Sequence, residues 1–299
     1  MPIDDVLAAV PELRDAHSVE PLTGGLTNTN YKVTSPSGCY VVRISGKDTS
    51  LLAIDRKNEV HNTIAAAETG VGAPFVAAVP EHAALVLGYL EGEVMDAAKL
   101  RGGDRIGAIA DACRRLHSGR RFLQDFDMFE IQPRYLAIVR ERGFRLPDRY
   151  EEFEPQVRDL ERAMRVRAER TVPCNNDLLA ENFIEVGGEL RLIDYEYSGN
   201  NEPSFELGNV WSESNLSLDQ LEELVGAYWG QPLRNKIARA RLWGLMSKYG
   251  WTLWGSIQAG ISDLDFDFWG WAIEKYERAV EELDGPQFEQ LLSDVQRED

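Results

Sequence analysis

The chain has 299 residues, of which 43% are hydrophobic and 27% charged, a composition typical of a globular protein with a large buried core. Fifty acidic residues against 32 basic ones give a formal net charge of −18, which argues against a nucleic-acid-binding surface. We find neither an apolar run of about 18 residues nor a signal peptide, so we expect no membrane insertion and a cytoplasmic location. The three cysteines are odd in number and far apart, which indicates reduced thiols.

The first ninety or so residues have the pattern of a small sheet. After an expected amphipathic helix over residues 4–17, two β-prone runs flank Gly24 and Gly25. A glycine pair between strands lets backbone N–H groups approach phosphates closely, although an ordinary hairpin turn has the same pattern. The next expected strand, Tyr40–Ile44, carries one basic residue, Arg43. A lone basic residue in an apolar strand often points to solvent, but such a cation can also bind nucleotide phosphates.

A helix ending near Thr69 is predicted to follow, with Thr49 or Ser50 as its cap. Glu59 lies beside the apolar stripe of this helix. A solvent-facing glutamate is the simplest interpretation of such a residue, but a helix glutamate can also position a phosphate-binding cation on a neighbouring strand. We therefore expect an ion pair between Glu59 and Arg43.

The chain is predicted to divide into two lobes, 1–92 and 93–299. Gly88–Gly92 follows an apolar strand, and we interpret it as the hinge between the lobes. The second lobe is expected to be mainly helical, since residues 104–117, 218–229 and 233–258 have helical apolar periodicity.

A β-hairpin is predicted around the glycine pair at 187–188. Counting outward from this turn places Asn182 and Asp194 together at the open end of the hairpin, with Asp177 on the incoming loop. Mg²⁺ prefers hard oxygen ligands, and a separate carboxylate is needed to orient an attacking hydroxyl. The spacing therefore indicates phosphoryl transfer from a nucleotide. An acidic surface hairpin with polar ends is the alternative interpretation.

The same stretch carries a family resemblance. Its three motifs, Asn175-Asn176-Asp177-x4-Asn182, Ile193–Tyr197 and Phe205–Asn209, resemble those of the choline/ethanolamine kinase family, within the wider aminoglycoside phosphotransferase-like group. Two positions depart from the family pattern. Asn175 stands where the family usually has His, and Glu206 stands where it usually has Asp.

The resemblance implies an α+β, protein kinase-like two-lobed fold. A small N-terminal antiparallel sheet lobe with one helix would precede a larger, mainly helical C-terminal lobe. It also implies roles for particular residues: Asp177 as the group that deprotonates the acceptor, Asn182 and Asp194 as Mg²⁺ ligands, Glu196 as an aid to metal or substrate, and Gly24, Gly25, Thr27, Asn28, Arg43 and Glu59 as the nucleotide site.

The aromatic residues near the C-terminus narrow the choice of substrate. All seven tryptophans lie between positions 211 and 271. Trp251 and Trp254 share a helix face, in a run that resembles the W-x-x-W-x-x-x-Q-x-x-I-S stretch of choline kinases. Phe266 and Trp271 fall where that family places further rings of the choline pocket. Several rings with carboxylates can hold a quaternary ammonium through cation–π attraction, although aromatic stripes also form ordinary cores.

We therefore predict an ATP- and Mg²⁺-dependent phosphotransferase that acts on the hydroxyl of a small cationic amino alcohol, with choline as the first choice. Ethanolamine, an aminoglycoside or thiamine are alternative acceptors. A non-catalytic nucleotide- or amine-binding module and an acidic interaction protein are alternatives of another class. The sequence gives no oligomeric state.

Overall fold

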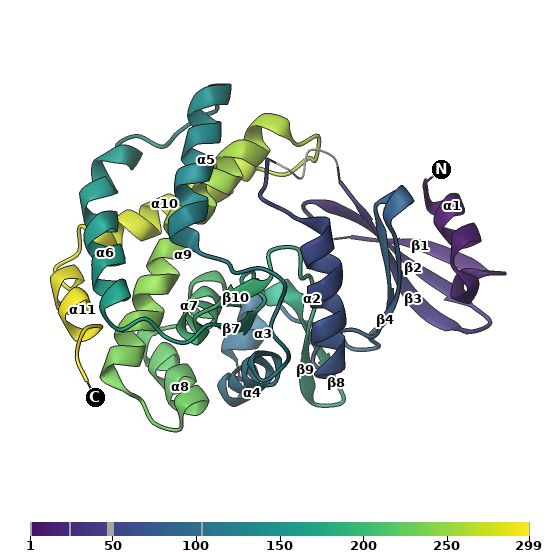
Figure 1. The fold of residues 1–299 in the computed structure, drawn as a ribbon, viewed down its shortest axis with the longest axis horizontal. Coiled ribbons are helices and arrows are strands. Elements are labelled where there is room, and N and C mark those ends of the chain that lie inside the picture. Colours follow the sequence, from purple (N-terminus) through teal and green to yellow (C-terminus); the bar gives the residue numbers. More distant parts are fainter. Residues whose placement is uncertain (1, 24, 47–50, 103, 299) are drawn as a thin grey trace.

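The computed structural model describes residues 2–23, 25–46, 51–102 and 104–298 (Figure 1). The N-terminal lobe is an antiparallel sheet with strand order β1-β2-β3-β5-β4. Its strands are β1 (Ser18–Leu22), β2 (Asn28–Ser35), β3 (Gly38–Ser45), β4 (Phe75–Val79) and β5 (Ala84–Gly88). The first helix, α1 (Pro2–Ala9), lies at the far edge of this lobe. It is shorter than the predicted helix over 4–17, because Pro11 disfavours helical backbone at Val10, which is extended.

Helix α2 (Arg56–Glu68) lies between the sheet and the helical lobe (Figure 1). Its cap is Asp55, whose carboxylate accepts hydrogen bonds from the backbone N–H groups of Lys57 and Asn58. The predicted caps, Thr49 and Ser50, lie outside the described residues, and the helix begins after both of them. The side chain of Asn58 donates to the carbonyl oxygen of Ser198, which joins α2 to the second lobe.

The second lobe contains two small sheets. Strand β6 (Glu93–Val94) pairs with β8 (Phe183–Val186), which pairs with β9 (Glu189–Leu192), while β7 (Val172–Cys174) pairs with β10 (Gly199–Asn201). The register of β8 and β9 confirms the predicted hairpin, since the backbone N–H of Ile193 donates to the carbonyl of Asn182 at 3.0 Å. Residue 92, just before β6, stays our proposed lobe boundary.

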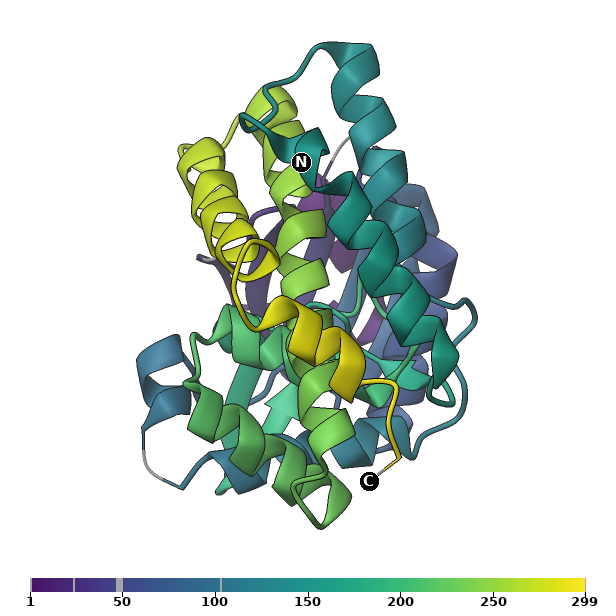
Figure 2. The ribbon, with the colours of Figure 1, turned by 90° about the vertical axis from the view of Figure 1, so that its left-hand side faces the viewer.

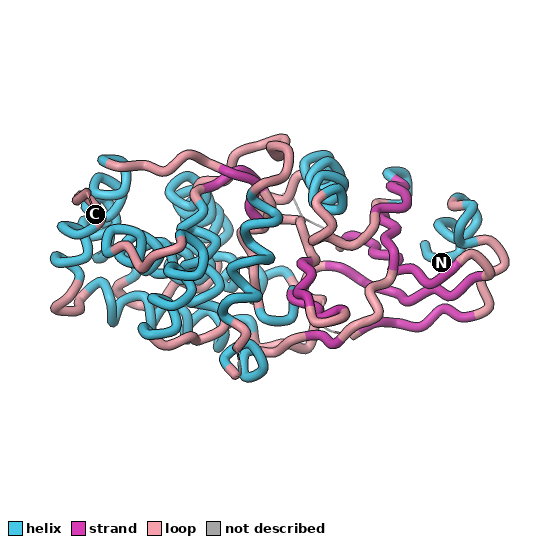
Figure 3. The backbone as a smooth tube through the Cα atoms, turned by 90° about the horizontal axis from the view of Figure 1, so that it is seen from below, coloured by secondary structure: helices cyan, strands magenta, loops and turns pink. Residues whose placement is uncertain are grey.

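The rest of the second lobe is helical, as predicted, so most helices lie toward one end of the molecule and the strands of the N-terminal sheet toward the other (Figure 3). The long helix α9 contacts most of the others (Figure 2). None of the helices in the described ranges is long and apolar enough to cross a membrane. The helices are α3 (Ala97–Arg101), α4 (Ile106–His117), α5 (Met128–Arg142), α6 (Glu154–Val166), α7 (Pro203–Glu213), α8 (Leu218–Trp229), α9 (Arg234–Ile261), α10 (Phe268–Leu283) and α11 (Phe288–Asp294).

Candidate active site

One cavity of about 550 Å³ contains most of the predicted site residues. It is bordered by residues 25–27 of the first lobe and by α7, α9, α10 and the β8–β9 hairpin region of the second. The predicted residues that line it are Gly25, Thr27, Asp177, Asn182, Asp194, Glu196, Trp251, Trp254, Phe266 and Trp271. Asn28, Arg43 and Glu59 lie behind its wall and contact wall residues or each other. Gly24 lies outside the described residues.

Three polar side chains meet at the open end of the hairpin. The amide nitrogen of Asn182 donates to the backbone carbonyl of Asp177 at 2.7 Å, which leaves the Asn182 amide oxygen as the atom that can bind a ligand. Asp194 has a φ of 61°, a left-handed backbone conformation that is rare outside glycine and often marks a functional site. Its side chain is 30% exposed, and Oδ1 accepts a hydrogen bond from Nη1 of Arg43 at 2.7 Å.

These residues fit a Mg²⁺ ion. Asn182 offers an amide oxygen, and Asp194 keeps a second carboxylate oxygen beside the one that Arg43 contacts. Mg²⁺ takes its remaining ligands from water and substrate phosphates, so one or two protein oxygens suffice.

The carboxylate of Asp177 lies in a negative environment. Its pKa is raised well above the usual value, because burial disfavours the charged form and because Asp194, Glu213 and Glu196 add negative charge. A divalent cation beside Asp194 would act in the opposite direction. The basicity of Asp177 therefore depends on the charges around it, as expected for a group that accepts a proton.

The predicted ion pair of Arg43 and Glu59 is present. Arg43 on β3 is buried, and its Nη2 donates to Oε1 of Glu59 on α2. Sequence reasoning missed Arg56, one turn before Glu59, whose Nη1 lies 2.7 Å from Glu59 Oε2 and 3.3 Å from Glu196 Oε2. The i, i+3 spacing of Arg56 and Glu59 on one helix was the available signal.

Residues 25–28 of the first lobe, called the glycine loop below, are hydrogen-bonded to Glu196. Oγ1 of Thr27 donates to Oε1 of Glu196 at 2.6 Å, and Nδ2 of Asn28 donates to Oε2 at 3.0 Å. Gly25 is required by close packing, because a Cβ there would lie 2.6 Å from the carbonyl oxygen of Asn28. The loop is thus held against the strand end that carries Asp194.

The predicted aromatic residues divide into two groups. Trp251 is 3% exposed and packs against Phe126, Tyr135 and Tyr197, so most of its ring belongs to the core. Phe266, at the other extreme, is 42% exposed.

Two further rings join the cavity to the core. Trp254 donates its Nε1–H to the hydroxyl of Tyr197 at 2.6 Å and meets the ring of Trp271 at a centroid distance of 5.3 Å. These two rings line the same cavity as the exposed ring of Phe266.

A carboxylate that sequence reasoning did not consider also faces the cavity. Glu213, at the end of α7, forms an ion pair through Oε2 with Lys275, whose Nζ lies 4.2 Å from the centre of the Trp271 ring. Its other oxygen, Oε1, is buried and has no hydrogen-bond partner among the described residues. Glu213 follows Asn209 by one helical turn, but no sequence signal indicated where its side chain would point.

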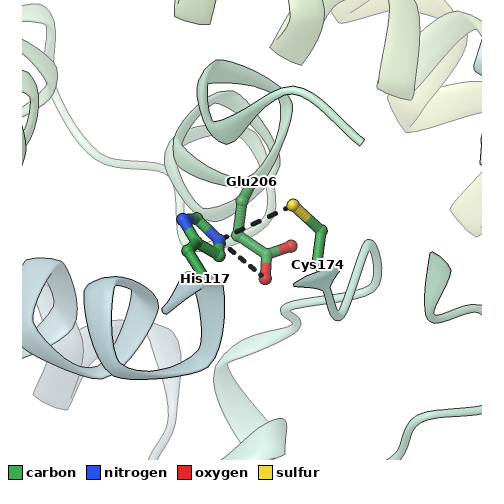
Figure 4. Close-up of side chains that lie close together, drawn as sticks. All are labelled: His117, Cys174 and Glu206. Carbon is green, nitrogen blue, oxygen red and sulfur yellow. Dashed lines mark hydrogen bonds and ion pairs between the residues drawn. The ribbon is translucent and has the colours of Figure 1, made fainter. Parts of the chain in front are cut away.

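Behind the loop of residues 175–182 lies a buried cluster of His117, Cys174 and Glu206 (Figure 4). The two oxygens of Glu206 accept the backbone N–H groups of Asn175 and Asn176, each at 2.8 Å. His117 shares a hydrogen bond with the hydroxyl of Tyr228, and Cys174 faces the carbonyl of Asn201. Each member has a protein partner without any ion, so we interpret the cluster as support for the loop that carries Asp177.

The fold and the site define a protein kinase-like phosphotransferase, with a sheet lobe, a helical lobe and an Asp–Asn–Asp group between them. The chain belongs to the choline/ethanolamine kinase family, because the model of the family described as choline/ethanolamine kinase matches residues 19–224. Human ethanolamine kinase 2 is 26% identical over 315 aligned positions, which cover 91% of this chain and 80% of the relative.

Solved structures agree with this assignment. A choline/ethanolamine kinase family protein from Mesorhizobium loti is 30% identical with a TM-score of 0.86, and the match covers 99% of each chain. The choline kinase LicA of Streptococcus pneumoniae is 26% identical with a TM-score of 0.81, over 94% of this chain and 98% of LicA. These findings confirm the predicted two-lobed, protein kinase-like fold. They also confirm the predicted class, an ATP-dependent small-molecule kinase that acts on amino alcohols.

Proposed function

We propose that this enzyme transfers the terminal phosphoryl group of ATP to the hydroxyl of choline, in a Mg²⁺-dependent reaction. The observation that carries the proposal is the shared cavity: Asp177, an aromatic wall and Glu213 line one space of about 550 Å³. A kinase of this kind must hold a cationic head group while it presents a hydroxyl to a carboxylate.

In this proposal Asp177 accepts a hydrogen bond from the acceptor hydroxyl and takes its proton as the oxygen attacks phosphorus. Arg43, held by Glu59 behind the wall of the cavity, supplies positive charge toward the nucleotide phosphates, and its guanidinium stays charged throughout. Gly25 and Thr27, in the loop before β2, and Asn28, the first residue of β2, cover the phosphates. A Mg²⁺ held by Asn182 and Asp194 would neutralise charge on the phosphates.

The trimethylammonium group of choline cannot donate a hydrogen bond, so rings and nearby negative charge must recognise it. Each good cation–π contact stabilises such a group by about 0.5–2 kcal/mol. Trp254, Trp271 and Phe266 line the cavity that also contains Asp177. We propose that these rings surround the ammonium, with Trp251 as the buried support behind them.

Ethanolamine is the second candidate acceptor. The unpartnered Oε1 of Glu213 favours it, because a primary ammonium carries N–H donors and choline has none. The relative named human ethanolamine kinase 2 points in the same direction.

We also propose that the enzyme works in the cytoplasm. Support comes from Cys39, Cys113 and Cys174, which are all free thiols in the structure.

An ATP-consumption assay tests the acceptor, with choline, ethanolamine, thiamine and an aminoglycoside compared at equal concentration in the presence of Mg²⁺. We expect the highest kcat/KM for choline and a lower one for ethanolamine. Preference for thiamine or the aminoglycoside would contradict the proposal.

A further inference from the structure

Four side chains form a closed ring of alternating charge between the lobes. Arg43 contacts Glu59 and lies 3.6 Å from Oε2 of Glu196. Arg56 closes the ring from the other side, because its Nη1 lies 2.7 Å from Oε2 of Glu59 and 3.3 Å from the same Glu196 oxygen. The ring joins β3, the first turn of α2 and the segment after β9.

The second arginine is required by the burial of the two glutamates. The side chains of Glu59 and Glu196 are only 2% and 4% exposed, so both carboxylates need positive partners. Arg43 cannot supply all of this charge, since its Nη1 is already bonded to Asp194. Arg56 therefore keeps Glu196 neutralised while Arg43 remains directed toward Asp194.

Arg56 also touches the glycine loop. Its Nη2 donates to Oδ1 of Asn28 at 3.3 Å, while Nδ2 of the same Asn28 donates to Glu196 at 3.0 Å. Both atoms of the Asn28 amide are thus held: Arg56 binds its oxygen, and Glu196 binds its nitrogen. Loss of Arg56 would release one end of this amide and leave a buried carboxylate short of positive charge.

We infer that Arg56 is a positioning residue for nucleotide binding: it holds the loop around Asn28 and the Arg43 guanidinium in the geometry that receives the phosphates. The inference rests on the proposed function, in which Arg43 and this loop bind ATP. Arg56 itself need not touch the nucleotide, because it acts through Asn28, Glu59 and Glu196.

Three variants test this role: Arg56→Gln, Arg56→Lys and, as a matched control, Lys57→Gln. Lys57 is the next residue of the same helix turn, and it is exposed. The dissociation constant of ADP is measured by calorimetry without Mg²⁺, alongside the melting temperature. Arg56→Gln should weaken ADP binding about tenfold. Arg56→Lys, which keeps the charge but not the fork that reaches Asn28, should weaken it about threefold.

The control should bind ADP as the wild type does. Wild-type affinity in the Arg56 variants that fold would overturn the inference, whatever happens to the melting temperature. Equal weakening by Arg56→Gln and Lys57→Gln would also overturn it, because it would indicate a general charge effect. A wild-type protein that binds no nucleotide would instead overturn the proposed function, and the inference with it.

Discussion

The backbone N–H of Asn175 donates to Oε1 of Glu206 at 2.8 Å, so the two positions at which the sequence departs from the family pattern are in direct contact. The side chain of Asn175 extends the connection, since its Nδ2 donates to the backbone carbonyl of Asp194 at 2.9 Å. Both departures therefore act on one loop, and together they link the segment that carries Asp177 to Asp194.

This contact predicts that the longer glutamate side chain is needed here. Glu206→Asp shortens the side chain by one methylene, so at least one of the buried N–H groups of Asn175 and Asn176 loses its acceptor. We expect a loss of about 1–3 kcal/mol in the free energy of unfolding, measured by urea denaturation, with lower turnover. Glu222→Asp on the exposed side of α8 is the matched control. Unchanged stability and turnover in Glu206→Asp would show that the loop does not depend on this contact.

Asp177→Asn should lower kcat by about 10²–10⁴, because an amide cannot accept the proton of the acceptor hydroxyl. Nucleotide affinity should change little, since Arg43 and the glycine loop lie elsewhere. Steady-state kinetics and an ADP titration check the two parts separately. A variant that turns over at nearly the wild-type rate would remove Asp177 from its assigned role.

Asp194→Asn should raise the Mg²⁺ concentration needed for half-maximal activity and lower the maximal rate. A neutral amide is a poorer ligand for a hard divalent cation, and the charged partner of Arg43 is lost at the same time. The check is a magnesium titration of activity at saturating ATP. An unchanged titration curve would mean that Asp194 does not hold the ion.

Phe266→Ala tests the aromatic wall without disturbing the core, because this ring is 42% exposed. We expect the KM for choline to rise by about two- to thirtyfold, the equivalent of one cation–π contact, with kcat and melting temperature nearly unchanged. Trp251→Leu is the contrasting variant. Loss of its buried ring should instead lower the free energy of unfolding, by up to the roughly 3–5 kcal/mol typical of Trp→Ala in a core. A normal choline KM in Phe266→Ala would exclude this ring from the binding site.

Glu213→Gln should separate the two candidate acceptors. The carboxylate oxygen that lacks a partner can accept an N–H from ethanolamine, whereas choline interacts with it only through diffuse charge. We expect kcat/KM for ethanolamine to fall more than that for choline. An equal fall for both acceptors would indicate that Glu213 acts through Lys275 and the shape of the cavity.

The sequence predicted the hairpin register because a two-residue glycine turn sets the pairing of both strands. That register alone brought Asn182 and Asp194 together. The predicted start of α2 was wrong. Several polar residues precede the helix, and among the described ones it is the carboxylate of Asp55 that caps it. Sequence periodicity identified Trp251 as a ring on the correct helix but could not show that its ring is mostly core.

Arg56 and Glu213 were missed in the sequence for the same physical reason. Arg56 pairs with Glu196, which is 140 positions away, and Glu213 pairs with Lys275 across two helices. Such long-range partners are set by the packing of the lobes and helices. A local pattern of charges does not distinguish them from residues on a solvated surface.

The most direct test of the central claim is ³¹P NMR of the reaction products. The purified enzyme is incubated with ATP, Mg²⁺ and choline or ethanolamine, and Asp177→Asn is the matched control. We predict a new phosphomonoester signal that appears with ADP in equal amounts and is absent with the variant. Formation of ADP and inorganic phosphate alone, with no phosphorylated amino alcohol, would contradict the account.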